Sequence, residues 1–215
     1  MGTKFSTRIW VSVVGIASIF LGSKGYADTV ISVADFGLKP DTRENAVAYV
    51  QKAIEACRGK EPVTLVFPEG RYDFWPQYAH EKNYYETNTY DVFPKRLAML
   101  FEGLHNITVD GNGSQFVMHD RIQPITVENC DGVTLKNFSI DWDIPLTAQA
   151  RVTKVGSDFF EIGINVLESP YIIEDGKLVF VGEGWKSALG SMIEFESDTH
   201  FVVPGTGDLV LGWNW

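Results

Sequence analysis

Apolar and polar residues alternate along much of the chain from residue 29 onward, which is the pattern of half-buried β-strands. Residues 30–37 alternate in this way and stop at a glycine. Residues 63–67 are a β-branched apolar run that is closed by Pro68-Glu69-Gly70, a typical turn sequence. The pattern predicts a fold made mainly of short strands.

One segment has the periodicity of a helix. Apolar residues recur on a single helical face over residues 42–58. Asp41 stands three positions before Glu44, which is the spacing of a capping box. We therefore expect a helix over 42–58 that begins next to Asp41.

A repeat follows this helix. Residues 106–117 form an alternating strand, a glycine-rich turn and a second strand, and residues 132–141 repeat the pattern, with Leu135 in the place of Val109, 26 positions earlier. Repeats of this length are typical of solenoids. Because the unit is strand–turn–strand, the repeat predicts an all-β protein with a right-handed parallel β-helix, in which each strand pairs with its equivalent one coil on. The helix is then expected to cap the first coil.

The pattern changes after Pro145. Apolar strands now come at hairpin spacing, joined by Gly156-Ser157-Asp158 and Glu174-Asp175-Gly176. We therefore expect residues 28–145 to hold the cap and the first coils. Residues 146–215 are expected to be an antiparallel β insertion, a barrel or a sandwich, that is truncated in this chain.

Residues 1–27 have the features of a secretory signal peptide. Lys4 and Arg8 precede an apolar run over 9–21, and Gly25 and Ala27 are small residues suited to cleavage. The run is shorter than the roughly 20 residues that span a bilayer. We expect cleavage near Ala27, a secreted or periplasmic protein and no stable membrane anchor; an uncleaved anchor is the alternative.

Charge narrows the choice of partners. Removal of the signal takes away three positive charges and no acids, which changes the net charge from −10 to −13. With no cluster of Lys and Arg, the chain lacks the basic surface that binds nucleic acid. Cys57 and Cys130 lie in the exported part, where a disulfide is permitted, but two buried free thiols are the preferred interpretation.

The sequence Asp141-Trp142-Asp143 is the first candidate for chemistry. On a strand, the two carboxylates point to one face and the indole to the other, with the Asp Cα atoms about 6.6 Å apart. The acids then bind sugar hydroxyls, or one of them acts in catalysis. The alternative is an acidic edge between the two parts, with Trp142 in the core.

Aromatic residues are dense between Tyr72 and Phe93, in what the sequence predicts to be a long loop. Aromatic rings stack on sugar faces or anchor interfaces. The alternatives for Trp75, Tyr84 and Tyr85 are a sugar site, a contact within a homodimer, and a loop packed by its own side chains. The four histidines, His80, His105, His119 and His200, have no metal-ligand spacing, so surface or hydrogen-bonded positions are expected and neither a metal nor a cofactor is predicted.

Two sets of residues resemble known families. Residues 33–37, 51–57 and 65–72 are similar to the entry of pectin-lyase-like β-helices. More specifically, residues 71–75, 137–145 and 203–208 resemble glycoside hydrolase family 110, the exported bacterial α-1,3-galactosidases, and the likeness runs over nearly all of 30–215.

That resemblance implies an exo-acting enzyme that removes terminal α-1,3-linked galactose from blood-group-B-type and linear glycans, with inversion and without a cofactor. Family members are longer than this chain, so it is interpreted as an N-terminal part that is inactive alone. In the family the catalytic carboxylates lie in later coils, so no catalytic residue is assigned before Trp215. The alternatives are a glycan-binding β-helix module without catalysis and another polysaccharide-degrading β-helix enzyme.

Overall fold

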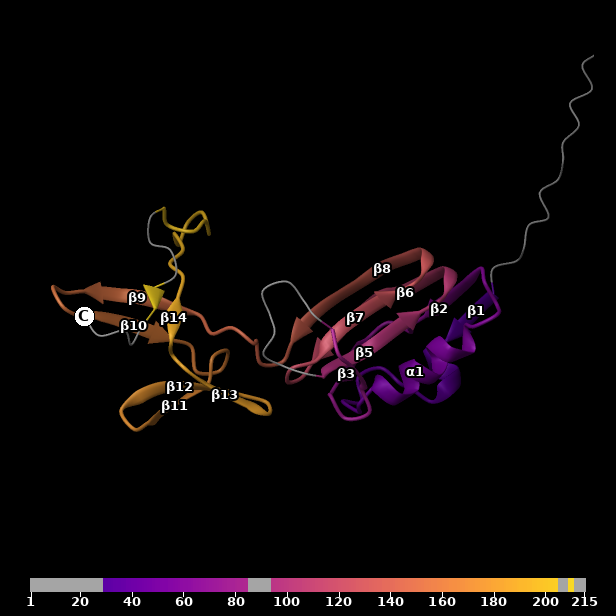
Figure 1. Ribbon diagram of the computed structural model, residues 1–215, viewed down its shortest axis with the longest axis horizontal. Helices are drawn as coiled ribbons and strands as arrows, with labels where there is room; N and C mark the ends of the chain where they lie inside the picture. Colours follow the sequence, from indigo (N-terminus) through magenta and orange to yellow (C-terminus); the bar gives the residue numbers. More distant parts are fainter. Residues whose placement is uncertain (1–28, 85–93, 205–208, 211–215) are drawn as a thin grey trace, which may run out of the picture.

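The computed structural model describes residues 29–84, 94–204 and 209–210. The predicted signal peptide lies outside these residues. Figure 1 shows two parts along the long axis, one with the α-helix and long, side-by-side strands and the other with short hairpins. Strands dominate the described chain, together with one α-helix. None of the described helices has both the length and the apolarity to cross a bilayer.

The first part is built on a sheet whose strands all run parallel. Its strands are β1 (Thr29–Ser32), β2 (Val63–Val66), β6 (His105–Met118), β8 (Asp131–Trp142) and β3 (Arg71–Phe74). β1, β2, β6 and β8 lie in this order, and β3 pairs with the second half of β6. Ile31, Leu65, Val109 and Leu135 form one row across four strands. The predicted equivalence of Val109 and Leu135 is therefore confirmed, and two further rungs precede them.

A second sheet lies opposite, with the core between the two. β5 (Lys95–Glu102) and β7 (Gln123–Glu128) pair in parallel, and the short β4 (His80–Lys82) pairs with β5 in the antiparallel sense. The side chains that fill the core are large and apolar, among them Phe67, Phe74, Met99, Phe101 and Phe116. Burial of this apolar surface is the main favourable contribution to folding.

β6 turns a corner at its glycine-rich sequence, residues 111–113, and β8 turns beside it. Their register shifts between Asp110 and Ser114, and Asn137 takes a positive φ of 59° at the bend. A Cβ added to Gly111 would lie 2.5 Å from the Cβ of Phe138 and 2.7 Å from the carbonyl oxygen of Asn137. Glycine is therefore required here because the two rungs approach each other closely.

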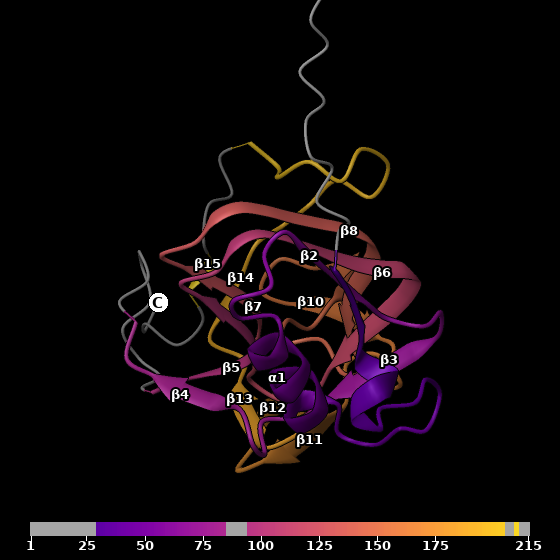
Figure 2. The same ribbon diagram turned by 90° about the vertical axis from the view of Figure 1, so that its right-hand side faces the viewer.

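Helix α1 (Val47–Ala56) covers one end of the parallel strands. In Figure 2 it lies at the centre of the view with the strands around it. Its buried face carries Val47, Val50, Ala53 and Ile54, and Cys57 lies buried directly after its last turn. Cys57 and Cys130 are both free thiols.

The helix begins later than the sequence predicted. Asp41 has a positive φ of 61°, and its carboxylate accepts a hydrogen bond from the backbone N–H of Arg71 instead of capping a helix. The N-cap is Ala46, which has no capping side chain, and the side-chain oxygen of the preceding Asn45 accepts from the N–H of Val47 at 3.1 Å. The expected capping box at Asp41 and Glu44 was wrong because Asp41 has a tertiary partner.

The predicted strand over 30–37 is also shorter than expected. β1 ends at Ser32, and a 3₁₀-helix, η1 (Val33–Phe36), follows. Ser32 and Asp35 form a reciprocal capping box, and Gly37 ends the turn at a φ of 94°. Side-chain hydrogen bonds to the backbone therefore outweigh the alternating pattern at this point.

The second part consists of antiparallel strands. They are β9 (Ala150–Val155), β10 (Phe160–Ile164), β11 (Tyr171–Glu174), β12 (Lys177–Gly182), β13 (Trp185–Ala188), β14 (Ser191–Met192) and β15 (Leu209–Val210). β9 pairs with β10, β11 with β12, β12 with β13, and β14 with β15. Many apolar side chains remain exposed in this part, including Val155, Leu167 and Phe201.

Candidate functional site

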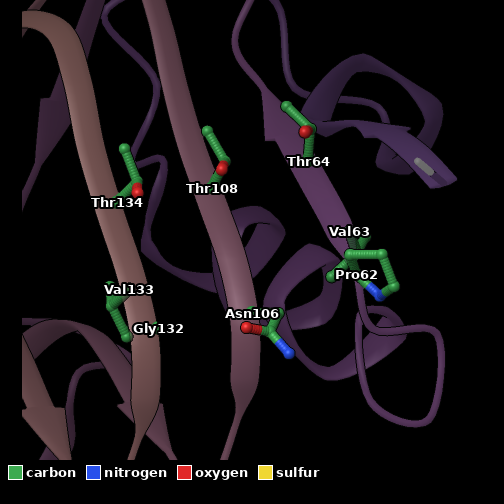
Figure 3. Close-up of a pocket in the computed structure, with 8 residues that line it drawn as sticks. All are labelled: Pro62, Val63, Thr64, Asn106, Thr108, Gly132, Val133 and Thr134. Atoms are coloured by element: carbon green, nitrogen blue, oxygen red, sulfur yellow. The ribbon is translucent and has the colours of Figure 1, made fainter. Parts of the chain in front are cut away.

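A shallow depression of about 390 Å³ lies on the outer face of the parallel sheet. It is lined by residues 62–64, 106, 108 and 132–134 (Figure 3). Thr64, Thr108 and Thr134 stand in register across its floor. None of its lining residues is charged, so the depression offers hydroxyl and amide groups but no acid or base.

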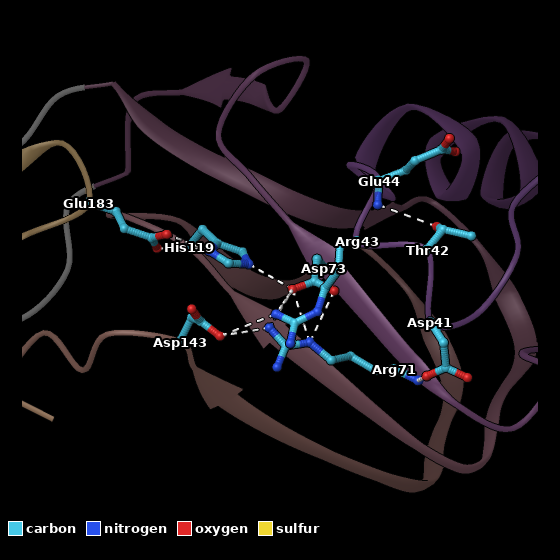
Figure 4. Close-up of polar contacts among 9 residues, drawn as sticks. All are labelled: Asp41, Thr42, Arg43, Glu44, Arg71, Asp73, His119, Asp143 and Glu183. Carbon is cyan, nitrogen blue, oxygen red and sulfur yellow. Dashed lines mark hydrogen bonds and ion pairs between the residues drawn. The ribbon is translucent and has the colours of Figure 1, made fainter. Parts of the chain in front are cut away.

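A cluster of charged side chains lies at the opposite ends of the same strands. Asp73 is on β3, His119 directly follows β6, and Asp143 directly follows β8. Because these strands are parallel, their carboxyl ends meet at one end of the sheet. The cluster, here called the Arg71 cluster, contains three acidic and three basic side chains: Asp73, Asp143, Glu183, Arg43, Arg71 and His119 (Figure 4).

Asp73 is the buried centre of the Arg71 cluster, with a side chain that is 0% exposed. Its carboxylate accepts from Arg71 Nη2 at 2.6 Å and lies 2.8 Å from His119 Nε2. Arg43 adds an ion pair at 3.6 Å. Burial alone would raise the pKa of Asp73, but the hydrogen bonds from Arg71 and His119 outweigh burial and hold the pKa below its ordinary value.

Asp143 is the accessible carboxylate of the cluster, with a side chain that is 40% exposed. It accepts from the same Arg71 Nη2 atom at 2.7 Å, and Arg43 lies 3.6 Å away. The hydrogen bond from Arg71 lowers the pKa of Asp143 against a smaller opposing effect of burial. Asp143 is therefore held as an ionised acceptor that faces solvent.

His119 lies between two carboxylates, and its side chain is 3% exposed. Nε2 faces Asp73, while Nδ1 lies 2.8 Å from both carboxylate oxygens of Glu183, in the turn between β12 and β13. The Trp75 ring stacks on the imidazole, with centroids 3.8 Å apart and planes within 10°. Packing on Trp75 thus fixes the plane in which the two nitrogens point.

A metal ion is a poor fit to this cluster. His119, Asp143 and Glu183 each place one ligand atom within 4.8 Å of the others. However, Arg71 already donates to Asp143, and the two nitrogens of His119 are at hydrogen-bond distance from carboxylates. Two arginines already face the three acids of the cluster, so a divalent ion would leave excess positive charge even without a charge on His119.

Of the predicted site residues, Asp143 belongs to this cluster and Trp75 packs against it. Asp143 bonds to Arg71, and Trp75 stacks on His119. Asp141 instead accepts a hydrogen bond from the backbone N–H of Trp142 at 2.8 Å. Trp142 packs against the core and donates its indole N–H to the carbonyl oxygen of Asp120 at 3.3 Å.

Tyr84 belongs to a different set of contacts. Its hydroxyl bonds to Glu128, which also accepts from Lys82 Nζ at 2.7 Å. Lys82 bonds in addition to Glu102 at 2.8 Å, so this set lies over the sheet of β5 and β7. Tyr85 lies outside the described residues, and so does most of the 203–208 motif.

Sequence reasoning missed Arg43, Arg71, Asp73 and Glu183 as site residues, and it gave His119 only a surface or hydrogen-bonded position. Arg71 and Asp73 stand two positions apart on a strand, a spacing that places both on one face and could have linked them. Glu183 carries no such signal, because only the docking of the β12–β13 turn brings it to His119.

One family model and several curated proteins match this chain. Residues 148–214 match the model of the GLAA-B beta-barrel domain I. The chain is 60% identical over 187 residues to alpha-1,3-galactosidase B of Bacteroides thetaiotaomicron, covering 87% of this chain and 30% of that protein. It is 36% identical to alpha-1,3-galactosidase A of Shewanella woodyi, over 78% of this chain and 28% of that protein.

A third relative is alpha-1,3-galactosidase B of Parabacteroides distasonis, 34% identical over 95% of this chain and 34% of its own length. The chain thus spans about a third of the length of the curated relatives it matches. The resemblance to the α-1,3-galactosidase family, drawn from residues 71–75, 137–145 and 203–208, is confirmed.

Proposed function

The chain is a relative of the α-1,3-galactosidases over the third of their length that it spans, and from this we propose that it is the N-terminal part of such a glycoside hydrolase. The observation that carries the proposal is the 60% identity over 187 residues to an alpha-1,3-galactosidase B. The proposed reaction is exo-acting hydrolysis of terminal α-1,3-linked galactose in blood-group-B-type and linear glycans, by a protein exported through its signal peptide.

We further propose that residues 28–145 are the cap and first coils of a right-handed parallel β-helix. The row of Ile31, Leu65, Val109 and Leu135 supports this, because equivalent positions of successive coils stack in such a fold. The antiparallel pairing of all strands after residue 146, and the barrel-domain match over 148–214, support a separate β insertion there.

The Arg71 cluster is the proposed contact with the galactoside. Asp143 is ionised and accessible, so it can accept hydrogen bonds from sugar hydroxyls. Trp75 can offer an aromatic surface to the C–H face of a sugar next to it. Asp141 and Trp142 precede Asp143 on β8 and remain proposed contacts with the sugar. Tyr84 is the less favoured contact, because its hydroxyl is bonded to Glu128.

The chemistry of Asp143 limits its role in an inverting mechanism. Inversion needs one protonated carboxylic acid to assist the leaving group and one carboxylate to activate water. Arg71 stabilises the ionised form of Asp143, so this residue suits substrate binding or the base role, not that of the acid. We expect the acid in the two thirds of the relatives that this chain does not span.

A chimera tests the proposal directly. The 187 matched residues of the Bacteroides thetaiotaomicron enzyme are replaced by the corresponding residues of this chain, and galactose release from a linear α-1,3-galactosyl disaccharide is measured. We expect release within about tenfold of the unmodified enzyme. NMR of the fresh product is expected to show the β anomer first, as inversion of an α-linkage requires.

The controls separate folding from function. Circular dichroism establishes that the chimera is folded, and a chimera with Asp143→Asn is compared with one carrying Asp141→Asn. A folded chimera that releases no galactose would contradict the galactosidase proposal; binding of the disaccharide without release would favour the glycan-binding alternative. Equal loss of activity in the two aspartate variants would remove the special role of Asp143.

A further inference from the structure

The two parts of the molecule meet through His119 and Glu183. His119 follows β6 of the parallel sheet, and Glu183 lies in the β12–β13 turn of the antiparallel part. Both oxygens of Glu183 are 2.8 Å from Nδ1 of His119, which is 3% exposed, while the Glu183 side chain is 30% exposed. A side chain on the rim of the second part thus reaches a buried ring in the first.

The turn is shaped to sit closely against the end of β6. Gly184 has a φ of 75°, and a Cβ at this position would lie 2.5 Å from a carboxylate oxygen of Asp120. The positive φ already favours glycine at this position, and an added side chain would also have to displace the Asp120 carboxylate. The turn therefore lies closely against the side chain of Asp120, the residue after His119.

The protonation state of His119 decides how many bonds it can make. A neutral imidazole has one N–H and one acceptor nitrogen, whereas an imidazolium has two N–H donors. Both nitrogens of His119 face carboxylate oxygens, those of Asp73 on β3 and of Glu183 in the turn. Only the protonated ring donates to both carboxylates.

Among the described contacts, no side chain other than His119 donates to Glu183. Asp143 adds negative charge within 4.8 Å, and the arginines that face the cluster, Arg71 and Arg43, are bound to Asp73 and Asp143. The stacked Trp75 is neutral. When His119 loses a proton, a carboxylate is left facing a bare nitrogen lone pair.

We propose that His119 and Glu183 form a pH-dependent latch, which docks the β12–β13 turn on the Arg71 cluster when His119 is protonated and weakens as the pH rises. This inference does not rest on the proposed enzymatic function.

Two measurements on the whole chain test the latch. The first is ¹⁵N NMR of the imidazole, which reports directly whether each ring nitrogen carries a proton. The second is a double-mutant cycle of His119→Gln and Glu183→Gln on the unfolding equilibrium constant, at about pH 6 and about pH 8.5. Glu174→Gln is the matched control, since Glu174 is an exposed acid of the same hairpin sheet and pairs with Lys186 at 3.3 Å.

We expect both nitrogens of His119 to carry protons at the lower pH and one at the higher. The coupling between the two residues should be about tenfold at about pH 6 and smaller at about pH 8.5, where the ring has lost its charge and one of its two donors, and the control should change neither. If His119→Gln does not fold, NMR of the Glu183→Gln variant decides, since loss of the partner should favour deprotonation of the ring. A single protonated nitrogen at both pH values, or a coupling that does not depend on pH, would overturn the latch.

Discussion

Asp73 and Asp143 share one donor atom, because Arg71 Nη2 lies 2.6 Å from the first and 2.7 Å from the second. The two aspartates lie at the ends of β3 and β8, the strands that flank the end of β6. Arg71 therefore links β3 to the end of β8 and connects a buried carboxylate to an accessible one.

Replacement of Asp143 by Asn is expected to destabilise the chain, while the same change at Asp141 leaves it nearly unaffected. Asp143→Asn removes the charge that faces Arg71, and we expect a loss of about 1 kcal/mol in the free energy of unfolding, since the site is partly exposed to solvent. Asp141 bonds only to the next backbone N–H among the described contacts, so its change should stay within about 0.5 kcal/mol. Urea denaturation of both variants measures the difference; equal losses would contradict the assignment.

Acid should weaken the fold through the same carboxylates. The pKa values of Asp73 and Asp143 are lowered in the folded protein, so their stabilising effect is present above the ordinary carboxyl range and is lost as the pH falls through the lowered values. The free energy of unfolding should thus decrease below about pH 4. A pH series of denaturation curves tests this, and Asp143→Asn should flatten the decrease.

Removal of Arg71 should cost more than removal of Asp143. Arg71→Met leaves the buried Asp73 with its remaining contacts to His119 and to the more distant Arg43. Loss of one partner from a buried charge pair costs about 3 kcal/mol, and we expect a loss of this order in thermal or urea unfolding. The pKa of Asp73 should rise in this variant, because its strongest hydrogen bonds are gone. A smaller loss than in Asp143→Asn would show that Asp73 does not depend on Arg71.

Gly111→Ala tests the close approach of β6 and β8. The new methyl group would lie 2.5 Å from the Cβ of Phe138, which stacks on Phe116, so the two rungs must move apart. We expect a loss of about 1–3 kcal/mol in the free energy of unfolding. Gly190→Ala is the control, because a Cβ there would meet only the carbonyl oxygen of Ala188, at 3.8 Å. Similar stabilities of the two variants would mean that the corner tolerates wider spacing.

The row of stacked apolar residues shows why only part of the repeat could be found in the sequence. The step from Val109 to Leu135 contains a strand, a turn and a strand, and its regular content made the repeat visible. The steps from Ile31 to Leu65 and from Leu65 to Val109 carry α1 and a long excursion through β4 and β5, which disguise the period. Loops of unequal length preserve the stacking in space but not the spacing in sequence.

The candidate site could also be predicted from the sequence only in part. Asp143 and Trp75 could be selected by residue type and position, since acids and aromatics near strand ends are recognisable in a sequence. The pairing of His119 with Glu183 depends on how a hairpin of the second part docks on the first, and no local pattern encodes that contact. Asp41 illustrates the same limit, because its bond to the backbone of Arg71 displaced a well-spaced helix cap.

The thiol of Cys57 gives the chain an internal chemical reporter. Burial raises the pKa of this thiol to about 11, so it is both covered and protonated while α1 stays in place. Alkylating reagents should therefore modify the half-buried Cys130 first and Cys57 only during moments when the helix detaches from the end of the strands. The rate of Cys57 labelling would therefore report the opening of α1 without any engineered probe.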